Sequence, residues 1–196
     1  PPSDLFVEIT QKPDPVAPDM PVKYQVDVGN RGPARDPGPV RVTFDIPPQS
    51  GGYIDLIEPG PNWRCTVQGR SVSCIHPSPI PANERGTAVT VTVKPYDPAN
   101  PADPNHPQNA KRQDPPTVQV RATATSDGSQ DPNPADNTAY RLTLFGDGLY
   151  RFDSPDDVWT GQGTHFTPRQ GLGSLQVMNL LKTREGTLYV GTARPG

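Results

Sequence analysis

The stretch SDGSQDPNPADN concentrates oxygen-bearing side chains that could bind a metal ion. Asp127, Asp131, Asn133 and Asp136 offer carboxylate and amide oxygens, the hard ligands that Ca²⁺ prefers. Their spacing differs from that of the Ca²⁺-binding loop motif, and Asx turns alone account for it equally well. We therefore predict a corner between strands that could hold calcium, and we expect no other cofactor.

The chain offers few groups for catalysis. Its three histidines lie in segments rich in proline or threonine and lack the HExxH spacing: His76, His106 and His165. It contains neither a G-x-S-x-G elbow nor a phosphate loop between a strand and a helix. We expect a protein that is not an enzyme and has no catalytic residues.

An intramolecular isopeptide bond is a second kind of chemistry to weigh. Lys12 or Lys23 in an early strand and Asn137 in a late one supply the two reacting groups. The reaction also needs a buried carboxylate between them, and the sequence does not place one there.

Both cysteines lie in NWRCTVQGRSVSC. If the chain reverses at Gly69-Arg70, Cys65 faces Cys74, and glycine at the first turn position suits a type II′ hairpin. The pair then falls on a non-hydrogen-bonded position with Cα atoms about 4.5 Å apart, a separation near that of disulfides. We predict this disulfide, whereas two free thiols or a two-ligand metal site are the alternatives.

A disulfide in turn predicts the compartment. Disulfides persist in oxidising surroundings, so we expect an extracellular or cell-surface protein, with the periplasm as second choice. Trp63, beside the cysteines, is expected to pack in the core or on the disulfide, with stacking on a ligand as the alternative.

The composition excludes several classes of protein. The net charge is −3 and no basic block occurs, which argues against a nucleic-acid partner. No apolar run approaches the roughly 18 residues of a membrane span. The chain holds 28 Pro and 18 Gly among 196 residues, but the prolines cluster between alternating runs, which favours ordered strands joined by stiff loops.

Alternation of apolar and polar residues predicts strands at six places, as in half-buried antiparallel sheets. With the cysteine hairpin this makes seven or eight strands within residues 1–145, which is typical of a two-sheet sandwich. The alternating sets are Leu5/Val7/Ile9, Val22/Tyr24/Val26/Val28, Val40/Val42/Phe44/Ile46, Val89/Val91/Val93, Val118/Val120/Ala122/Ala124 and Tyr140/Leu142/Leu144.

Residues 97–116 read DPANPADPNHPQNAKRQDPP and have no apolar periodicity. We predict an extended loop, mobile at its centre, in which His106, Lys111 and Arg112 are solvated.

Residues 4–145 resemble a repeat domain of unknown function from large bacterial surface and secreted proteins. The resemblance rests on DLFVEITQKPDPVAPDMPVKYQVDVGNRGP, VRVTFDIPP, the Trp-Cys…Cys hairpin, IPANERGTAVTVTVKP and a closing DNT segment. It implies an immunoglobulin-like sandwich that acts as a non-catalytic spacer or adhesive module. The long proline segment and the single copy depart from the family's pattern.

Residues 146–196 differ in character, with more glycine and aromatic residues. Four short strands can be drawn there, at 149–153, 164–167, 176–181 and 187–192. The spacing of Leu175, Met178 and Leu181 also hints at a short helix. The pattern, ending in GTLYVGT, resembles the β-propeller repeat of two-component sensor ectodomains, which implies one four-stranded blade. Because a propeller needs several blades, the segment is incomplete alone.

These observations predict an all-β chain: an immunoglobulin-like antiparallel sandwich (1–145) followed by a single propeller-like repeat (146–196). We expect a non-enzymatic extracellular module, structural or adhesive, whose partners are other copies of the chain or surface proteins, in a homo-oligomer or filament. A fragment of a ligand-sensing ectodomain is the alternative. The residues expected to mediate assembly are Leu149, Tyr150, Phe152, Trp159, Phe166, Leu188, Tyr189 and Val190.

Overall fold

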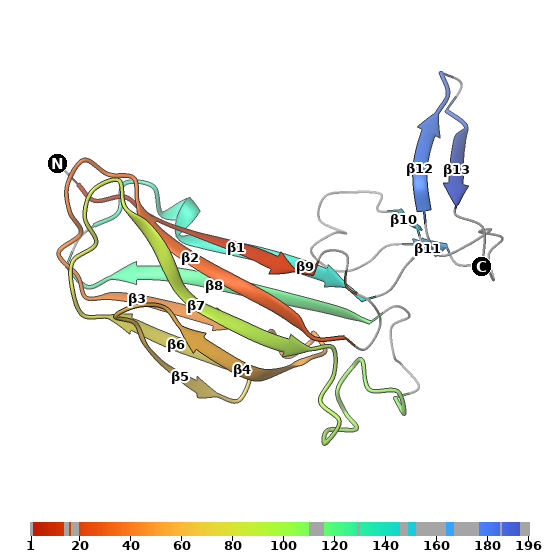
Figure 1. Cartoon of the computed structure of the whole chain (residues 1–196), viewed down its shortest axis with the longest axis horizontal. Helices are drawn as coiled ribbons and strands as arrows, with labels where there is room; N and C mark the ends of the chain where they lie inside the picture. The colour runs from red at the N-terminus through yellow and green to blue at the C-terminus, as the bar shows by residue number, and fades with distance from the viewer. Residues whose placement is uncertain are drawn as a thin grey trace.

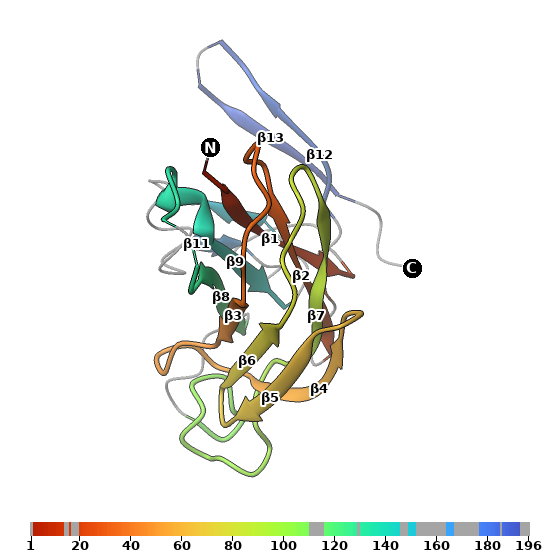
Figure 2. The same ribbon diagram turned by 90° about the vertical axis from the view of Figure 1, so that its left-hand side faces the viewer.

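The computed structural model of the chain describes residues 2–13, 16, 20–109, 116–128, 130–145, 149–151, 164–166, 177–184 and 186–192. Two antiparallel sheets pack face to face (Figures 1 and 2), in the orders β1-β2-β7-β4 and β5-β6-β3-β8-β9. The strands are β1 (Leu5–Lys12), β2 (Val22–Asn30), β3 (Val40–Asp45), β4 (Tyr53–Pro59), β5 (Arg64–Gln68), β6 (Ser71–His76), β7 (Arg85–Lys94), β8 (Thr117–Ser126) and β9 (Thr138–Leu144).

The order of the strands is immunoglobulin-like. β1, β2 and β7 take the places of strands A, B and E in one sheet, and β3, β8 and β9 those of C, F and G in the other. The predicted all-β sandwich is therefore confirmed. β4 was not predicted, because a bulge between Ile54 and Leu56 interrupts its alternation of inward and outward side chains.

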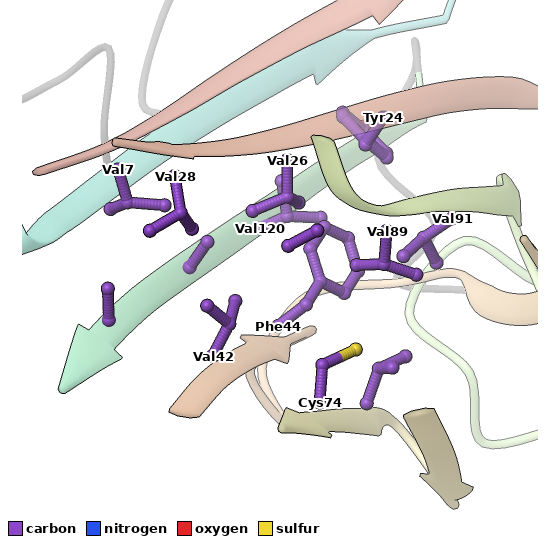
Figure 3. Packing of buried hydrophobic residues seen from close by; sticks show 14 of the residues in the cluster. Val7, Tyr24, Val26, Val28, Val42, Phe44, Cys74, Val89, Val91 and Val120 are labelled. Atoms are coloured by element: carbon purple, nitrogen blue, oxygen red, sulfur yellow. The ribbon is translucent and has the colours of Figure 1, made fainter. Parts of the chain in front are cut away.

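The core lies between the sheets and is built largely of valines (Figure 3). Tyr24 of β2 and Phe44 of β3 meet at its centre, with ring centroids 5.8 Å apart. Both side chains are fully buried. Since β-branched residues fit a pleated, buried surface well, the valine-rich alternating runs account for the strands that enclose this core.

The side chains of β9 face the opposite way from the sequence prediction. Tyr140 is 48% exposed, whereas Thr143 is 1% exposed. The register pairs Tyr140 with Arg121 on the outer face. Thr143 and Arg141 instead reach Gln11 of β1, at 2.7 and 3.0 Å from its Oε1. These bonds join the two sheets along one side of the sandwich.

Residues 97–109 form a chain of turns, so the prediction of an extended loop is wrong for this part. The repeating unit is three residues long: a hydrogen-bonding residue, a proline and a third residue, as in Asp97-Pro98-Ala99. In each unit the carbonyl of the first residue accepts the N–H three positions on. Its side chain accepts the N–H two positions on. The residues at the first position are Asp97, Asn100, Asp103 and His106.

Two side chains anchor this turn segment to one end of the sandwich. The Asp103 carboxylate accepts the N–H of Gly52 at 3.1 Å, and Asn105 Nδ2 donates to the carbonyls of Pro95 and Thr117 at 2.9 and 2.7 Å. Both anchors are almost fully buried. The sandwich is shaped to receive them: a Cβ at Gly51 would lie 2.1 Å from Asn105 Nδ2.

His106 is buried rather than solvated. Its Nδ1 accepts the N–H of Gln108 at 3.2 Å, and its ring meets Tyr96 edge-on, with centroids 5.5 Å apart. Histidine therefore plays the part that Asp and Asn play in the preceding turns. Lys111 and Arg112 lie outside the described residues.

The described part of the C-terminal segment holds four strands in two separate antiparallel pairs. β10 (Leu149–Arg151) pairs with β11 (Thr164–Phe166), and β12 (Val177–Lys182) pairs with β13 (Leu188–Thr192). The four-stranded blade implied by the propeller resemblance is thus not formed among these residues. The helix suggested by the spacing of Leu175, Met178 and Leu181 is also wrong for the last two residues, because both lie in β12, where Leu181 pairs with Tyr189. Leu175 lies outside the described residues.

Candidate functional site

The predicted acidic corner gathers three carboxylates. Asp4 precedes β1, while Asp131 and Asp136 lie on the connection from β8 to β9, where Pro134–Asn137 forms a 3₁₀ turn. One oxygen from each of the three carboxylates lies within 4.8 Å of the others. The sandwich brings them together because β1 packs beside β9.

The bonds at this corner leave several oxygens unused. Asp131 accepts the N–H of Leu5 and that of Asn133, each at 2.8 Å, and the second bond is an Asx turn. Arg31 donates to Asp136 Oδ2 at 2.9 Å. Three further oxygens are buried without a hydrogen-bond partner among the described residues: Asp4 Oδ1, Asp136 Oδ1 and Asn137 Oδ1.

The electrostatics of the corner disfavour its negative charge. Burial raises the pKa of the Asp4 carboxyl, and the charges of Asp136 and Asp131 raise that pKa further, with Arg31 offsetting part of the effect. A divalent cation would offset the repulsion between these carboxylates, and the unused oxygens would serve as its ligands. The geometry therefore suits a hard cation such as Ca²⁺, which takes oxygen ligands.

Two of the four predicted ligands, Asp131 and Asp136, lie at this corner. Asp127 instead pairs with Arg41 at 3.0 Å, and Asn133 contributes the backbone N–H of the Asx turn described above. Asp4 was missed because it lies more than a hundred residues away in the sequence. Its one signal was its place directly before the first predicted strand.

The predicted disulfide joins Cys65 and Cys74, whose Cα atoms lie 4.1 Å apart. The hairpin register matches the prediction at every pair, from Gln68↔Ser71 to Cys65↔Cys74. Gly69 has a φ of +60°, as the first turn position of this hairpin requires.

Trp63 lies partly buried against the core, as predicted. Its ring contacts that of His76, with centroids 5.0 Å apart. His76 Nδ1 also lies 2.7 Å from the carbonyl oxygen of Ser78. Two of the three histidines, His76 and His106, thus hold structural contacts, and His165 lies in β11.

The lysines considered for an isopeptide bond are misplaced for it. Asp136 and Asn137 lie near the start of β1, because Asp131 and Asp136 contact Asp4 and Leu5. Lys12 ends that strand, seven residues or roughly 23 Å further on, and Lys23 pairs with Lys12 in the adjacent strand. The isopeptide hypothesis is therefore wrong for both lysines.

The hairpin of β12 and β13 carries apolar side chains on both of its faces. Leu180 is paired with Val190, and Leu181 with Tyr189; neighbouring positions in a strand point to opposite faces. Leu180, Leu181 and Tyr189 are each more than half exposed. Figure 1 shows this hairpin projecting away from the sandwich.

The other described residues predicted to mediate assembly lie on β10, β11 and β13. Leu188 is 49% exposed on β13, and Phe166 on β11 is partly buried. Leu149 and Tyr150 lie in β10. Phe152 and Trp159 fall outside the described residues. Leu180 and Leu181 join the exposed set.

None of the described residues belongs to a helix with the length and apolarity needed to cross a bilayer.

Comparisons with known proteins give only distant likenesses. No protein-family model matches the chain, and no curated protein matches it. Among solved structures, the chain is similar to the CARDB domain of the PF1109 protein of Pyrococcus furiosus, crystallised with di-metal ions, at 19% identity and a TM-score of 0.41. The match covers 74% of this chain and 89% of that one.

Two further structures have comparable similarity. A cohesin module of a Clostridium perfringens family 33 glycoside hydrolase is 9% identical with a TM-score of 0.43, over 74% of this chain and 97% of that one. AvmM, which catalyses macrocyclization in alchivemycin A biosynthesis, is 11% identical with a TM-score of 0.39, over 76% and 92%. At this distance the likenesses do not assign a function to the chain.

Proposed function

We propose that the chain is a non-enzymatic module of an extracellular or cell-surface assembly, with a structural or adhesive role. The disulfide between Cys65 and Cys74 supports an oxidising compartment. The rings of His76 and His106 pack against Trp63 and Tyr96, so we assign both histidines a structural role and not a catalytic one.

One observation carries the proposal: the β12–β13 hairpin exposes Leu181 and Tyr189 on one face and Leu180 on the other. A two-stranded hairpin is marginal in water by itself. A few hundred Å² of exposed apolar surface costs several kcal/mol at about 25 cal/mol per Å², and open strand edges invite pairing with another chain. The partners we propose are other copies of the chain or surface proteins.

A contact between the hairpin of one copy and the sandwich of the next joins two different surfaces. Such a contact is head-to-tail and extends into a filament unless it closes into a ring. Light scattering of the full chain and of a version ending at Phe145 tests this. The full chain should assemble and the shortened one should stay monomeric, and two monomeric samples would rule the assembly out.

We also propose that the corner of Asp4, Asp131 and Asp136 binds Ca²⁺, which would stabilise the junction between β1 and β9. The supporting observation is the buried and unused oxygens of Asp4 and Asp136. With Asp131 and water they would complete a coordination shell of six to eight oxygens. The Asx turn at Asp131 then helps to build the calcium site, and it is not an alternative explanation for the acidic residues of this corner.

A chelator titration followed by thermal unfolding tests the calcium site. Chelation should lower the Tm of the unmodified chain, because a ligand that binds only the folded state stabilises it. Asp4→Asn should abolish the response, while Asp127→Asn, outside the corner, should keep it. A Tm that is the same with and without chelator would remove calcium from the proposal.

A further inference from the structure

A groove of about 460 Å³ opens on the outer face of the five-stranded sheet. The loop after β3, with Pro47, Pro48 and Gln49, lines the groove, as do Gln119 and Arg121 of β8 and Tyr140 of β9.

Four of the residues that line the groove form a row across the sheet. The register places Ser71 of β6 opposite Asp45 of β3, Asp45 opposite Arg121, and Arg121 opposite Tyr140. Arg121 donates to Asp45 Oδ2 at 3.2 Å, and Ser71 Oγ donates to Asp45 Oδ1 at 2.6 Å. The row thus presents donors, acceptors and an aromatic ring, with its two charges paired.

The adjacent outward-facing row consists only of hydroxyl side chains. In register across all five strands these are Thr66, Ser73, Thr43, Thr123 and Thr138. Neighbouring strands lie about 4.8 Å apart, so the row is a regular line of hydroxyls beside the groove. The surface on this side of the groove is therefore polar and uncharged.

Arg70 makes the wall of the groove rigid. Its guanidinium donates to the carbonyls of Pro47 and Gly52, at 3.0 and 2.9 Å, and also to that of Ser50. A further bond joins Arg70 Nε to the carbonyl of Ile46 at 3.3 Å. These bonds tie the loop to the hairpin turn, so the groove is preformed, which reduces the entropy cost of binding.

We propose that this groove binds a neutral polysaccharide chain, with Tyr140 stacking on a sugar ring and the Asp45–Arg121 pair and Gln119 bonding its hydroxyls. An anionic ligand is disfavoured because Arg121 is already paired with Asp45. A peptide that adds a strand is disfavoured because it would bind a sheet edge, whereas Asp45 and Arg121 lie on β3 and β8, which each pair with a strand on both sides. The inference rests on the adhesive role proposed above and names its ligand.

Electrophoresis in native gels that contain hydroxyethylcellulose, soluble starch or galactomannan tests the proposal. At least one polymer should retard the full chain. Tyr140→Ala should weaken that affinity by about tenfold, as expected for a lost stacking contact, and Tyr140→Phe should keep it. Arg121→Gln should weaken it as well. Tyr140 and Arg121 are about half exposed, so these changes should leave the fold intact.

Tyr189→Ala is the matched control, since Tyr189 is also an exposed tyrosine but lies on the β12–β13 hairpin. It should keep retardation by the polymer while it weakens assembly in light scattering, and Tyr140→Ala should do the reverse. The two readouts separate a failure of the groove from a failure of assembly. Mobility that none of the three polymers changes, or equal retardation of Tyr140→Ala and the unmodified chain, would overturn the proposal. So would equally tight, Tyr140-dependent binding of unfolded carboxymethylated lactalbumin, which would assign the groove to peptides.

Discussion

The hydroxyl of Tyr24 on β2 lies 2.5 Å from that of Thr143 on β9, inside the core and between the two sheets. Thr143 Oγ1 donates its single proton to Gln11 Oε1 at 2.7 Å, so Tyr24 is the donor to Thr143. Burial of its hydroxyl raises the pKa of Tyr24 far above the usual value. A neutral hydrogen-bond chain therefore connects β2, β9 and β1.

The two linked hydrogen bonds predict that substitutions of Tyr24 and Thr143 lower stability by different amounts. Tyr24→Phe removes one bond and leaves Thr143 bonded to Gln11, so it should cost about 1 kcal/mol in the free energy of unfolding. Thr143→Val strands the buried Tyr24 hydroxyl and should cost more, about 1–3 kcal/mol. Urea unfolding of both, and of the double variant, gives the coupling between them. Additive losses in the double variant would contradict a direct bond.

Removal of the disulfide should lower the stability of the protein but leave its fold intact. Replacing Cys65 and Cys74 together with alanine should lower the free energy of unfolding by roughly 2–3 kcal/mol, because the cross-link restricts the unfolded chain. The β-sheet circular dichroism should persist, since most of the core lies on other strands. A thiol assay in denaturant should count no free thiols in the unmodified chain, and a count of two would refute the bond.

The turn segment predicts that asparagine can replace His106. His106→Asn keeps an acceptor for the Gln108 N–H, whereas His106→Leu, of similar bulk, removes it. Hydrogen exchange should show Gln108 protected in the unmodified chain and in His106→Asn, but exposed in His106→Leu. If all three chains exchange alike, the side-chain bond does not hold the turn.

The environment of Asp27 predicts that the free energy of unfolding depends on pH. Asp27 is 7% exposed; burial disfavours its charge, but hydrogen bonds from Arg85, Gln25 and Thr87 outweigh this and lower its pKa. Because the folded pKa lies below the unfolded value of about 3.9, the ionised group stabilises the fold above that value. This contribution is lost as the pH falls through the folded pKa.

The test is the gap in the free energy of unfolding between the unmodified chain and Asp27→Asn. It should be constant from pH 7 to 5 and should narrow as the pH is lowered below about 4. Glu58→Gln, which breaks the exposed ion pair with Lys23, is the control and should change stability by less than about 1 kcal/mol. A gap that does not change with pH would mean that the Asp27 charge contributes nothing.

Local pattern in the sequence was enough to predict the hairpin and most of the strands. The register from Gln68 to Ser71 follows from the turn at Gly69-Arg70, and that register alone brings the two cysteines together. The valine alternation of β2, β3 and β8 follows from the two-residue period of a strand with one buried face. These features depend on residues close together in the chain, so the sequence contains their cause.

Contacts between distant segments decided the rest. The alternation of β9 pointed Tyr140 inward, but inward bonds of Thr143 and Arg141 to Gln11 turned it out onto the groove. Asp4 joined Asp131 and Asp136 only because β1 packs beside β9.

Contacts with distant residues also decided the structure of the proline-rich segment. The composition of residues 97–109 is that of a linker, yet Asp103 and Asn105 are buried in the end of the sandwich. Short-range Asx bonds set the shape of each turn, but Gly51 and Gly52, some fifty residues away, provide the space and the N–H that hold the segment in place. Local sequence thus determines which backbone conformations are low in free energy. Tertiary packing alone decides which distant groups form hydrogen bonds with a polar side chain when it is buried.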